Sequence, residues 1–213
     1  MHSSIQVIKP TPTLALVTLY EAKTLLGIPT NSTTDDEALQ FLIERASDEV
    51  QTLCSRFFPK ETVIETFREV DNPITKLYLS RYPVKPNEIT LIEGDGTPWD
   101  IEYDVDSFSG KLSLWGGNLW TSSISVEYSG GYALPHEVPP ALKQAVLLFT
   151  KDAYHAAARG DSSIRQIAHK ESRISYFDAP KDGGGASGSG SSGMSAAQKA
   201  AQSLLQRFTR LTA

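Results

Sequence analysis

Four carboxylates alternate with apolar residues near the middle of the chain and are its best candidates for enzyme chemistry. They are Asp100, Glu102, Asp104 and Asp106. A strand would place all four on one face, with neighbours about 6.6 to 6.8 Å apart, where they can bind a divalent cation or act as acid and base. The same pattern is typical of a solvated strand face, and no histidine or second acidic cluster stands beside it. We favour the solvated face, and a metal-dependent enzyme remains the alternative.

Other chemical motifs are weaker. Residues 188–193 match the letters of the dinucleotide-binding fingerprint, but that motif needs a buried strand before it, and here only more Gly and Ser precede it. The four histidines have no ligand spacing, and Cys54 lies in an apolar helical stripe. We therefore expect no catalytic residue, no metal ligand and no cofactor.

Glycine and charge divide the 213 residues into unequal parts. Most of residues 181–193 are Gly or Ser, a composition typical of a flexible linker. The segment 194–213 carries three cations and no acid, so it holds +3 while the rest of the chain holds −8 of the net −5. We expect an acidic body over 1–180, a linker and a basic tail. A single cysteine fits a reducing compartment, and no apolar stretch reaches the roughly 20 residues of a membrane span.

Helical patterns stand on both sides of a strand-rich region. Capping-box spacing at Thr18 and Glu21 predicts a short first helix over 20–26, and a second box at Thr34 and Glu37 precedes an apolar stripe that continues to residue 57. Two prolines open a third helix over 139–160, which should pack on the second.

Between these helices, residues 61–128 change to a period of two and contain repeated turn signals. The expected strands cover 62–70, 76–79, 89–93, 101–106, 111–114 and 123–128. Residues 164–177 read as a small helix followed by an extended piece. The fold class is therefore α+β: a small helical bundle with an inserted antiparallel β-sheet lobe and a tethered C-terminal helix.

The tail over 194–213 has the pattern of an amphipathic helix. It is either a docking element that orders on a partner's groove or a helix that folds back on its own body. The expected docking residues are Lys199, Leu204, Leu205, Arg207, Phe208, Arg210 and Leu211.

The order of these elements resembles the head-tail connector (adaptor) proteins of tailed bacteriophages, which also occur in gene-transfer particles. The N-terminal pattern of the family is similar to residues 19–27, followed by an acidic turn and the helix through 46–57. A Pro-Val step opens the middle strand at 82–84. An aromatic strand end with a glycine turn at 126–132 then leads to the proline-led helix at 138–145.

The resemblance, over about residues 17 to 178, implies a non-enzymatic role in the virion neck, reached from the host cytoplasm during assembly. Connectors of this kind form a ring, typically of twelve copies, beneath the portal protein. The ring extends the DNA channel towards the tail or its stopper. The resemblance gives the tail a partner, the portal, and lets double-stranded DNA pass without sequence-specific binding; no membrane partner is expected. Another neck or tail-completion protein is the alternative.

Overall fold

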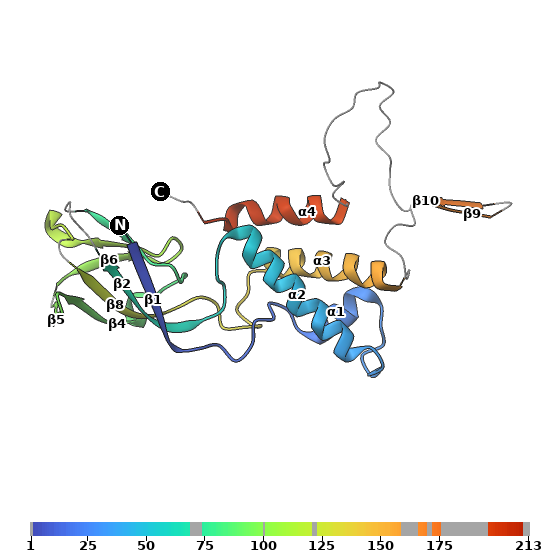
Figure 1. Ribbon diagram of the computed structural model, residues 1–213, viewed down its shortest axis with the longest axis horizontal. Helices are drawn as coiled ribbons and strands as arrows, with labels where there is room; N and C mark the ends of the chain where they lie inside the picture. Colours follow the sequence, from blue (N-terminus) through green and yellow to red (C-terminus); the bar gives the residue numbers. More distant parts are fainter. Residues whose placement is uncertain are drawn as a thin grey trace, which may run out of the picture.

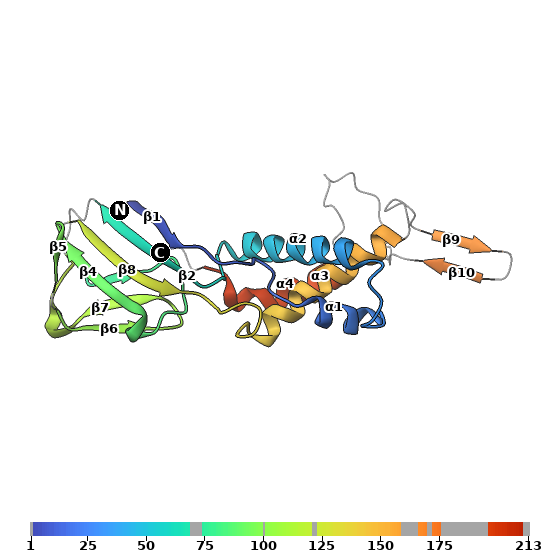
Figure 2. The ribbon, with the colours of Figure 1, turned by 90° about the horizontal axis from the view of Figure 1, so that it is seen from below.

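The computed structural model describes residues 2–68, 74–99, 101–120, 123–158, 166–169, 172–175 and 196–210. These residues form an α+β fold, as the sequence predicted. The molecule is elongated: a β lobe lies at one end, the helices lie in the middle, and a two-stranded hairpin lies beyond the other end of the helices (Figures 1 and 2). The predicted linker, 181–193, lies outside the described residues.

Four helices build the bundle: α1 (Leu19–Leu26), α2 (Asp36–Cys54), α3 (Pro140–Ala158) and α4 (Ala196–Leu205). The apolar stripe of α2 packs against α3, so the predicted cover of the second helix by the third is confirmed. Their shared core is extended by Leu16 and Val17 ahead of α1 and by Phe58 beyond α2.

The first capping box is present and the second is not. Thr18 accepts a hydrogen bond from the N–H of Glu21, whose carboxylate accepts one from the N–H of Thr18. Helix α2 instead begins after Asp35, whose side chain makes no cap hydrogen bond, so the prediction of a box at Thr34 is wrong. The helix also stops at Cys54, three residues earlier than predicted, because Ser55 adopts a left-handed conformation with φ 49°.

The β lobe contains two antiparallel sheets. The larger has the strand order β1-β2-β8-β4-β5, and the smaller has the order β3-β7-β6. The strands are β1 (His2–Lys9), β2 (Glu61–Arg68), β3 (Lys76–Tyr78), β4 (Ile89–Gly94), β5 (Thr97–Pro98), β6 (Tyr103–Asp106), β7 (Lys111–Leu114) and β8 (Ile124–Gly130). Figure 2 shows β6 and β7 as a layer facing the larger sheet.

The side chains between the two sheets form a second hydrophobic core, separate from that of the helices. Val63 and Phe67 of β2 and Val126 of β8 point inward from the larger sheet and meet Leu77 of β3 and Leu112 of β7. Alternation along each strand explains the arrangement, because every second residue faces this core.

Three strands were not predicted: β1, the short β5 that pairs with β4, and β9 (Gln166–His169). Strand β1 pairs with β2 at the edge of the larger sheet, although Ile5 and Val7 alternate with polar residues in the pattern of a strand. Strand β9 pairs with β10 (Ser172–Ser175) as a hairpin. The extended piece near residue 173 is therefore confirmed, and the small helix predicted before it is wrong.

The chain passes between the two lobes from β1 to α1, from α2 to β2 and from β8 to α3, and the last two of these crossings lie side by side. The N–H of Tyr132 donates to the carbonyl of Phe58, and the N–H of Gly131 donates to the carbonyl of Pro83. Gly131 has φ 111°, and a Cβ there would lie 2.3 Å from the carbonyl oxygen of Pro59. The glycine turn of the connector-like pattern therefore has a physical reason, because only glycine lets these two crossings pass so closely.

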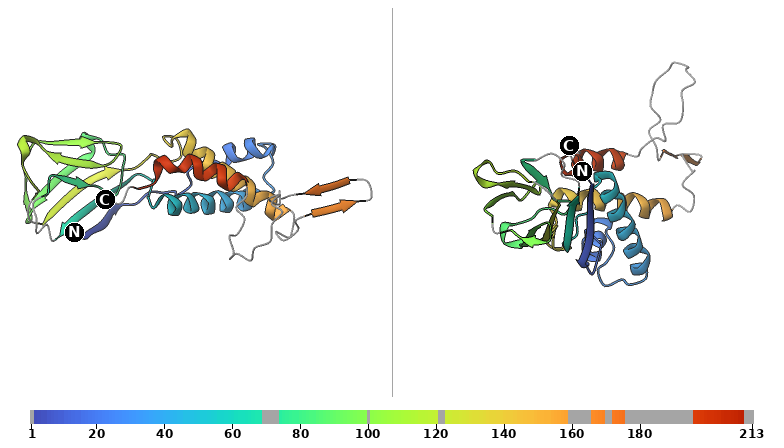
Figure 3. Two further views of the ribbon diagram at one scale, coloured as in Figure 1. Left: turned by 90° about the horizontal axis from the view of Figure 1, so that it is seen from above. Right: turned by 60° about the vertical axis from the view of Figure 1, so that its left-hand side comes forward.

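The C-terminal segment packs on its own chain. Helix α4 lies along α3, and the short 3-10 turn that follows it (Gln206–Phe208) is directed towards the β lobe (Figure 3). Ala201, Leu205 and Phe208 are buried in the core of the bundle. Of the two alternatives open for the tail, the structure therefore has the one in which it folds back on the body.

Candidate partner-binding surfaces

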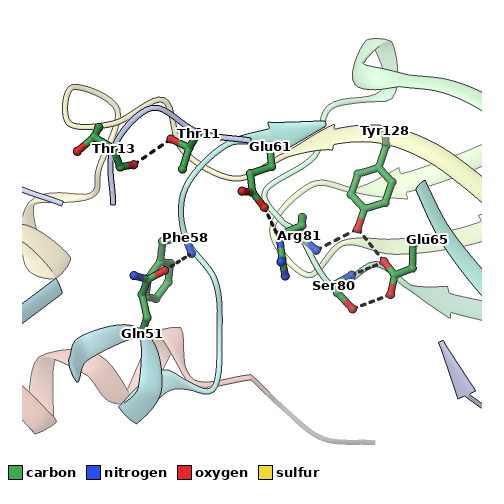
Figure 4. A network of polar contacts seen from close by, with 9 residues as sticks. All are labelled: Thr11, Thr13, Gln51, Phe58, Glu61, Glu65, Ser80, Arg81 and Tyr128. Atoms are coloured by element: carbon green, nitrogen blue, oxygen red, sulfur yellow. Dashed lines mark hydrogen bonds and ion pairs between the residues drawn. The ribbon is translucent and has the colours of Figure 1, made fainter. Parts of the chain in front are cut away.

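A buried carboxylate organises the inside of the β lobe. Glu65 of β2 is fully buried and accepts hydrogen bonds from the N–H and the hydroxyl of Ser80, at 2.9 and 2.6 Å, and from the hydroxyl of Tyr128, at 2.7 Å (Figure 4). Burial raises the pKa of Tyr128, and the neighbouring Glu65 charge adds to the effect. Glu65 lines neither of the two pockets described below. Its role is to fix the loop after β3 to strands β2 and β8.

A guanidinium lies at the junction of the two lobes. Arg56, just beyond the end of α2, is only 9% exposed, and its charge centre lies 3.6 Å from the centroid of the Tyr82 ring. Its Nη2 donates to the carbonyl of Tyr82 at 2.5 Å, while its Nε is buried without a hydrogen-bond acceptor among the described residues. Burial lowers the pKa of Arg56. Because α2 ends at Cys54, Arg56 lies outside the helix and its side chain can extend towards the β lobe.

A pocket of about 270 Å³ opens beside Arg56, between the β lobe and the end of the tail. Arg207 and Arg210 line it from the tail, and Tyr78 and Phe108 line it from the β lobe. The Nη2 of Arg210 donates to the hydroxyl of Ser80 at 3.3 Å, and its backbone N–H donates to the carbonyl of Cys54. We name this site the arginine pocket.

The seven predicted docking residues are divided by the fold. Leu205 and Phe208 are buried in the protein's own core, so docking through them would require the tail to leave the bundle, and their docking role stays a prediction. Leu204 is half-buried on the same core, and Lys199 is exposed. Leu211 lies outside the described residues. Docking through the remaining cations stays a prediction.

A wider groove runs over the helices. It has a volume of about 520 Å³ and lies between α2, α3 and the start of α4. Its lining mixes apolar Leu42 and Phe149 with charged Arg45 and Glu49. This composition is that of a wet surface rather than a dry ligand pocket.

The β lobe also has an open edge. On its outer side β1 has no hydrogen-bonded strand within the described part of the chain. Ile5 and Val7, on the face shared with buried Val63 of β2, are 38% and 42% exposed. Long edge strands with apolar side chains are the surfaces that pair with another chain.

The predicted acidic strand face forms only in part, because β6 begins at Tyr103: Asp104 and Asp106 lie in the strand and Glu102 lies just before it. Glu102, Asp104 and Asp106 are exposed and alternate with half-buried residues, while Asp100 lies outside the described residues. Asp106 accepts hydrogen bonds from the hydroxyl of Ser109 and the N–H of Phe108, and these bonds lower its pKa. Within the described ranges, no group of three His, Cys, Asp or Glu side chains is placed to hold a metal ion.

Two further predictions can be placed. Cys54 is buried in the bundle, as its position in the apolar stripe predicted, and burial raises its pKa to about 11. None of the helices that the structure describes combines the length and apolarity needed to cross a bilayer.

Arg56 and Glu65 were missed by sequence reasoning. Glu65 did carry a signal, because it alternates with Val63 and Phe67 and so falls on the inner face of its strand. Arg56 carried none, since its partner Tyr82 is 26 residues away.

Comparison with known proteins places the fold. The chain is similar to one in the neck of an empty gene transfer agent particle computed with C6 symmetry (TM-score 0.59, 14% identity, 99% of this chain and 97% of that chain). It is also similar to a chain in the virion of the native particle (TM-score 0.58, 14% identity, 98% and 96% covered). A chain in the native neck computed with C12 symmetry is similar to the same degree (TM-score 0.58, 15% identity, 99% and 97% covered).

No curated protein matches the chain in sequence. A family model described as head completion protein matches residues 15–163. That range holds the helical bundle up to α3 and the β lobe from β2 onward, and the predicted resemblance to neck proteins of phage-like particles is confirmed. Because the match spans more than half of the sequence, the chain belongs to the head completion protein family.

Proposed function

We propose that this chain is a non-enzymatic structural protein of the head-tail neck of a tailed phage or gene transfer agent. Its copies form a ring below the portal that extends the DNA channel and joins the capsid to the tail. The observation that carries the proposal is the family match over residues 15–163. The similarity of nearly the whole chain to neck chains supports it further.

The charge of the chain suits this role. At a net −5, and with an exposed acidic face at Glu102 and Asp104, the protein is a poor ligand for the phosphate backbone. A channel lining of like charge lets a duplex slide, whereas a basic lining would hold it. Double-stranded DNA is therefore a passenger in this proposal, not a specifically bound ligand.

The ring needs a lateral contact in which one surface meets a different surface of the next copy. The β1 edge is our candidate for one side of that contact, with a second copy of this chain as its occupant. The substitutions Ile5→Lys and Val7→Lys are expected to weaken ring formation, because they place charges on the apolar face of the strand. Gln6→Lys is the matched control, since Gln6 alternates with these residues and lies on the other face.

Imaging of isolated neck complexes tests the function directly. Particles purified from a producing host should contain the chain in a ring, proposed to be of twelve copies, between the portal and the stopper or tail-completion protein. Particles lacking the gene should have capsids without attached tails, with assembly restored by the wild-type gene. Finding the chain at another level of the neck or tail would favour the alternative, a different neck or tail-completion protein. Absence of the chain from purified particles would refute a neck role altogether.

A further inference from the structure

The arginine pocket contains an electrostatic imbalance. Arg56, Arg207 and Arg210 line it, and no Asp or Glu is among its lining residues. The chain as a whole is acidic, so three guanidinium groups gathered around one recess are not explained by composition. In the described part of the chain, none of the three arginines takes part in an ion pair with a carboxylate.

Arg56 makes the imbalance costly. It is about nine-tenths buried, its Nε has no acceptor, and its partners are all neutral: the carbonyl oxygen of Tyr82, the side chain of Tyr132 and aromatic faces. A buried charge is stabilised by an opposite charge far more than by neutral dipoles. An anion held in the pocket would supply that charge through a low-dielectric environment.

Two acids near the pocket do not supply it. The Glu65 carboxylate already accepts hydrogen bonds from Ser80 and Tyr128. The Asp106 carboxylate accepts from Ser109 and from the N–H of Phe108. The outer guanidinium groups of Arg207 and Arg210 therefore remain the ones that can receive an incoming anion.

The shape of the pocket favours a carboxylate over DNA. A recess of about 270 Å³ admits one side chain, whereas duplex DNA presents a convex row of phosphates that needs an open basic surface. A planar carboxylate fits the fork of a guanidinium through two parallel hydrogen bonds. Tyr78 and Phe108 are exposed at the pocket and provide apolar contact for residues beside the acid.

We propose that the arginine pocket binds a carboxylate side chain of an acidic peptide segment supplied by a neighbouring protein chain. The proposed function enters only in the source of the segment, which is another copy of this chain in the ring: its Glu102 and Asp104 are exposed and carry carboxylates that the pocket can take. Binding itself needs only the folded single chain, so the test below does not depend on ring formation.

The test uses the full chain and a fluorescein-labelled heptapeptide, Gly-Ser-Glu-Phe-Glu-Ser-Gly, with fluorescence anisotropy at low salt. A second peptide with Gln in place of both Glu residues is the matched probe. We expect saturable binding of the Glu peptide and at least about tenfold weaker binding of the Gln peptide, as for loss of a charge-assisted pair. Equal binding of both peptides, or no binding of the Glu peptide at about 1 mM, the affinity of a minimal contact, would overturn the proposal.

Single variants locate the binding. Arg207→Gln and Arg210→Gln should each weaken binding of the Glu peptide about tenfold. Lys199→Gln removes the same charge from the same tail outside the pocket, and it should weaken binding by less than about twofold. Arg207 is exposed, so its variant stays folded even if Arg210→Gln, which loses the bond to Ser80, does not. An equal loss in Lys199→Gln, or tighter binding of a 12-base-pair DNA duplex than of the peptide, would contradict a specific carboxylate site.

A probe that copies residues 101–107 identifies the source of the acid. Its binding in competition with the Glu peptide assigns the segment to another copy of this chain. Binding of the Glu peptide without binding of this probe would overturn the assignment to another copy and point to a different neck protein.

Discussion

Replacement of Phe208 by alanine tests whether the C-terminal tail is part of the folded body. Phe208 is 8% exposed and meets the ring of Phe58 edge to face, with ring centroids 6.3 Å apart. If the tail is an independent docking element, the substitution leaves the stability of the body unchanged. If the tail fills the bundle core, the substitution removes a buried aromatic ring from that core.

The expected loss follows from the burial of the side chain. Phe-to-Ala changes in protein cores cost about 3 to 5 kcal/mol, and an edge-to-face pair contributes about 0.5 to 1.5 kcal/mol of that. Phe208 stands near the surface, where neighbours can collapse into the space, so we expect the free energy of unfolding to fall by about 2 to 4 kcal/mol. With a urea dependence of about 2 kcal/mol per molar, the midpoint moves down by about 1 to 2 M.

Urea unfolding followed by far-UV circular dichroism measures the shift, and Lys199→Ala is the control. Lys199 is exposed on α4 in the same tail, so loss of its side chain should change the free energy of unfolding by less than about 0.5 kcal/mol. A second readout is the reaction of Cys54 with a thiol reagent, because the backbone of Arg210 is bonded to the carbonyl of Cys54. Equal midpoints and equal thiol reactivity in wild type and Phe208→Ala would refute the packed tail.

Three further predictions test the β lobe, the junction and the bundle. Glu65→Gln should lower the free energy of unfolding by about 1 to 3 kcal/mol, because an amide nitrogen would face buried donors. Glu102→Gln, at an exposed position just before β6, should be near neutral in the same urea titration. Gly131→Ala should lower the thermal midpoint of unfolding far more than Gly96→Ala. Both glycines have positive φ, but a Cβ at residue 131 would lie 2.3 Å from a backbone carbonyl oxygen, whereas a Cβ at residue 96 would have open space around it. The folded-state pKa of Cys54, about 11, lies above its ordinary 9.0, so the stability from its neutral thiol is present below pH 9 and is lost as the pH rises towards 11. Wild type should therefore lose stability more steeply than Cys54→Ala across that window, and parallel pH curves would contradict this.

Local patterns predicted the elements whose boundaries depend on local forces. The capping box at Thr18 and the proline at the start of α3 act within a few residues, and both elements lie where the sequence placed them. Strand β7 was predicted with its exact bounds, because turn residues stand on both sides of it. The α+β class follows from the same local periods.

Predictions failed where distant contacts decide the outcome. The apolar stripe of α2 continues to Phe57 in the sequence, yet the helix ends at Cys54 because the chain must turn towards the β lobe. The tail pattern fits a partner's groove and the protein's own bundle equally well. Only the three-dimensional position of α3 decides that Leu205 and Phe208 are covered by their own chain.

The candidate site shows the same limit. Arg207 and Arg210 were predicted as contact residues from the charge of the tail, and both line the arginine pocket. The residues that shape the pocket were not predicted as a group, because Arg56 and Tyr82 come together only when the bundle meets the β lobe.

The packed tail also restricts how the protein can contact a portal. A tail that left the bundle to dock elsewhere would expose Leu205 and Phe208, at about 1.5 to 3 kcal/mol each. Contacts with the portal would first have to offset this cost of about 3 to 6 kcal/mol. The cost alone would weaken the apparent affinity of the tail for the portal by a factor of about 10² to 10⁴. Contact through Lys199, Arg207 and Arg210 carries no such cost, because these side chains already lie wholly or partly outside the core. We therefore expect charge-reversing variants of these cations to reduce portal association while the tail stays packed.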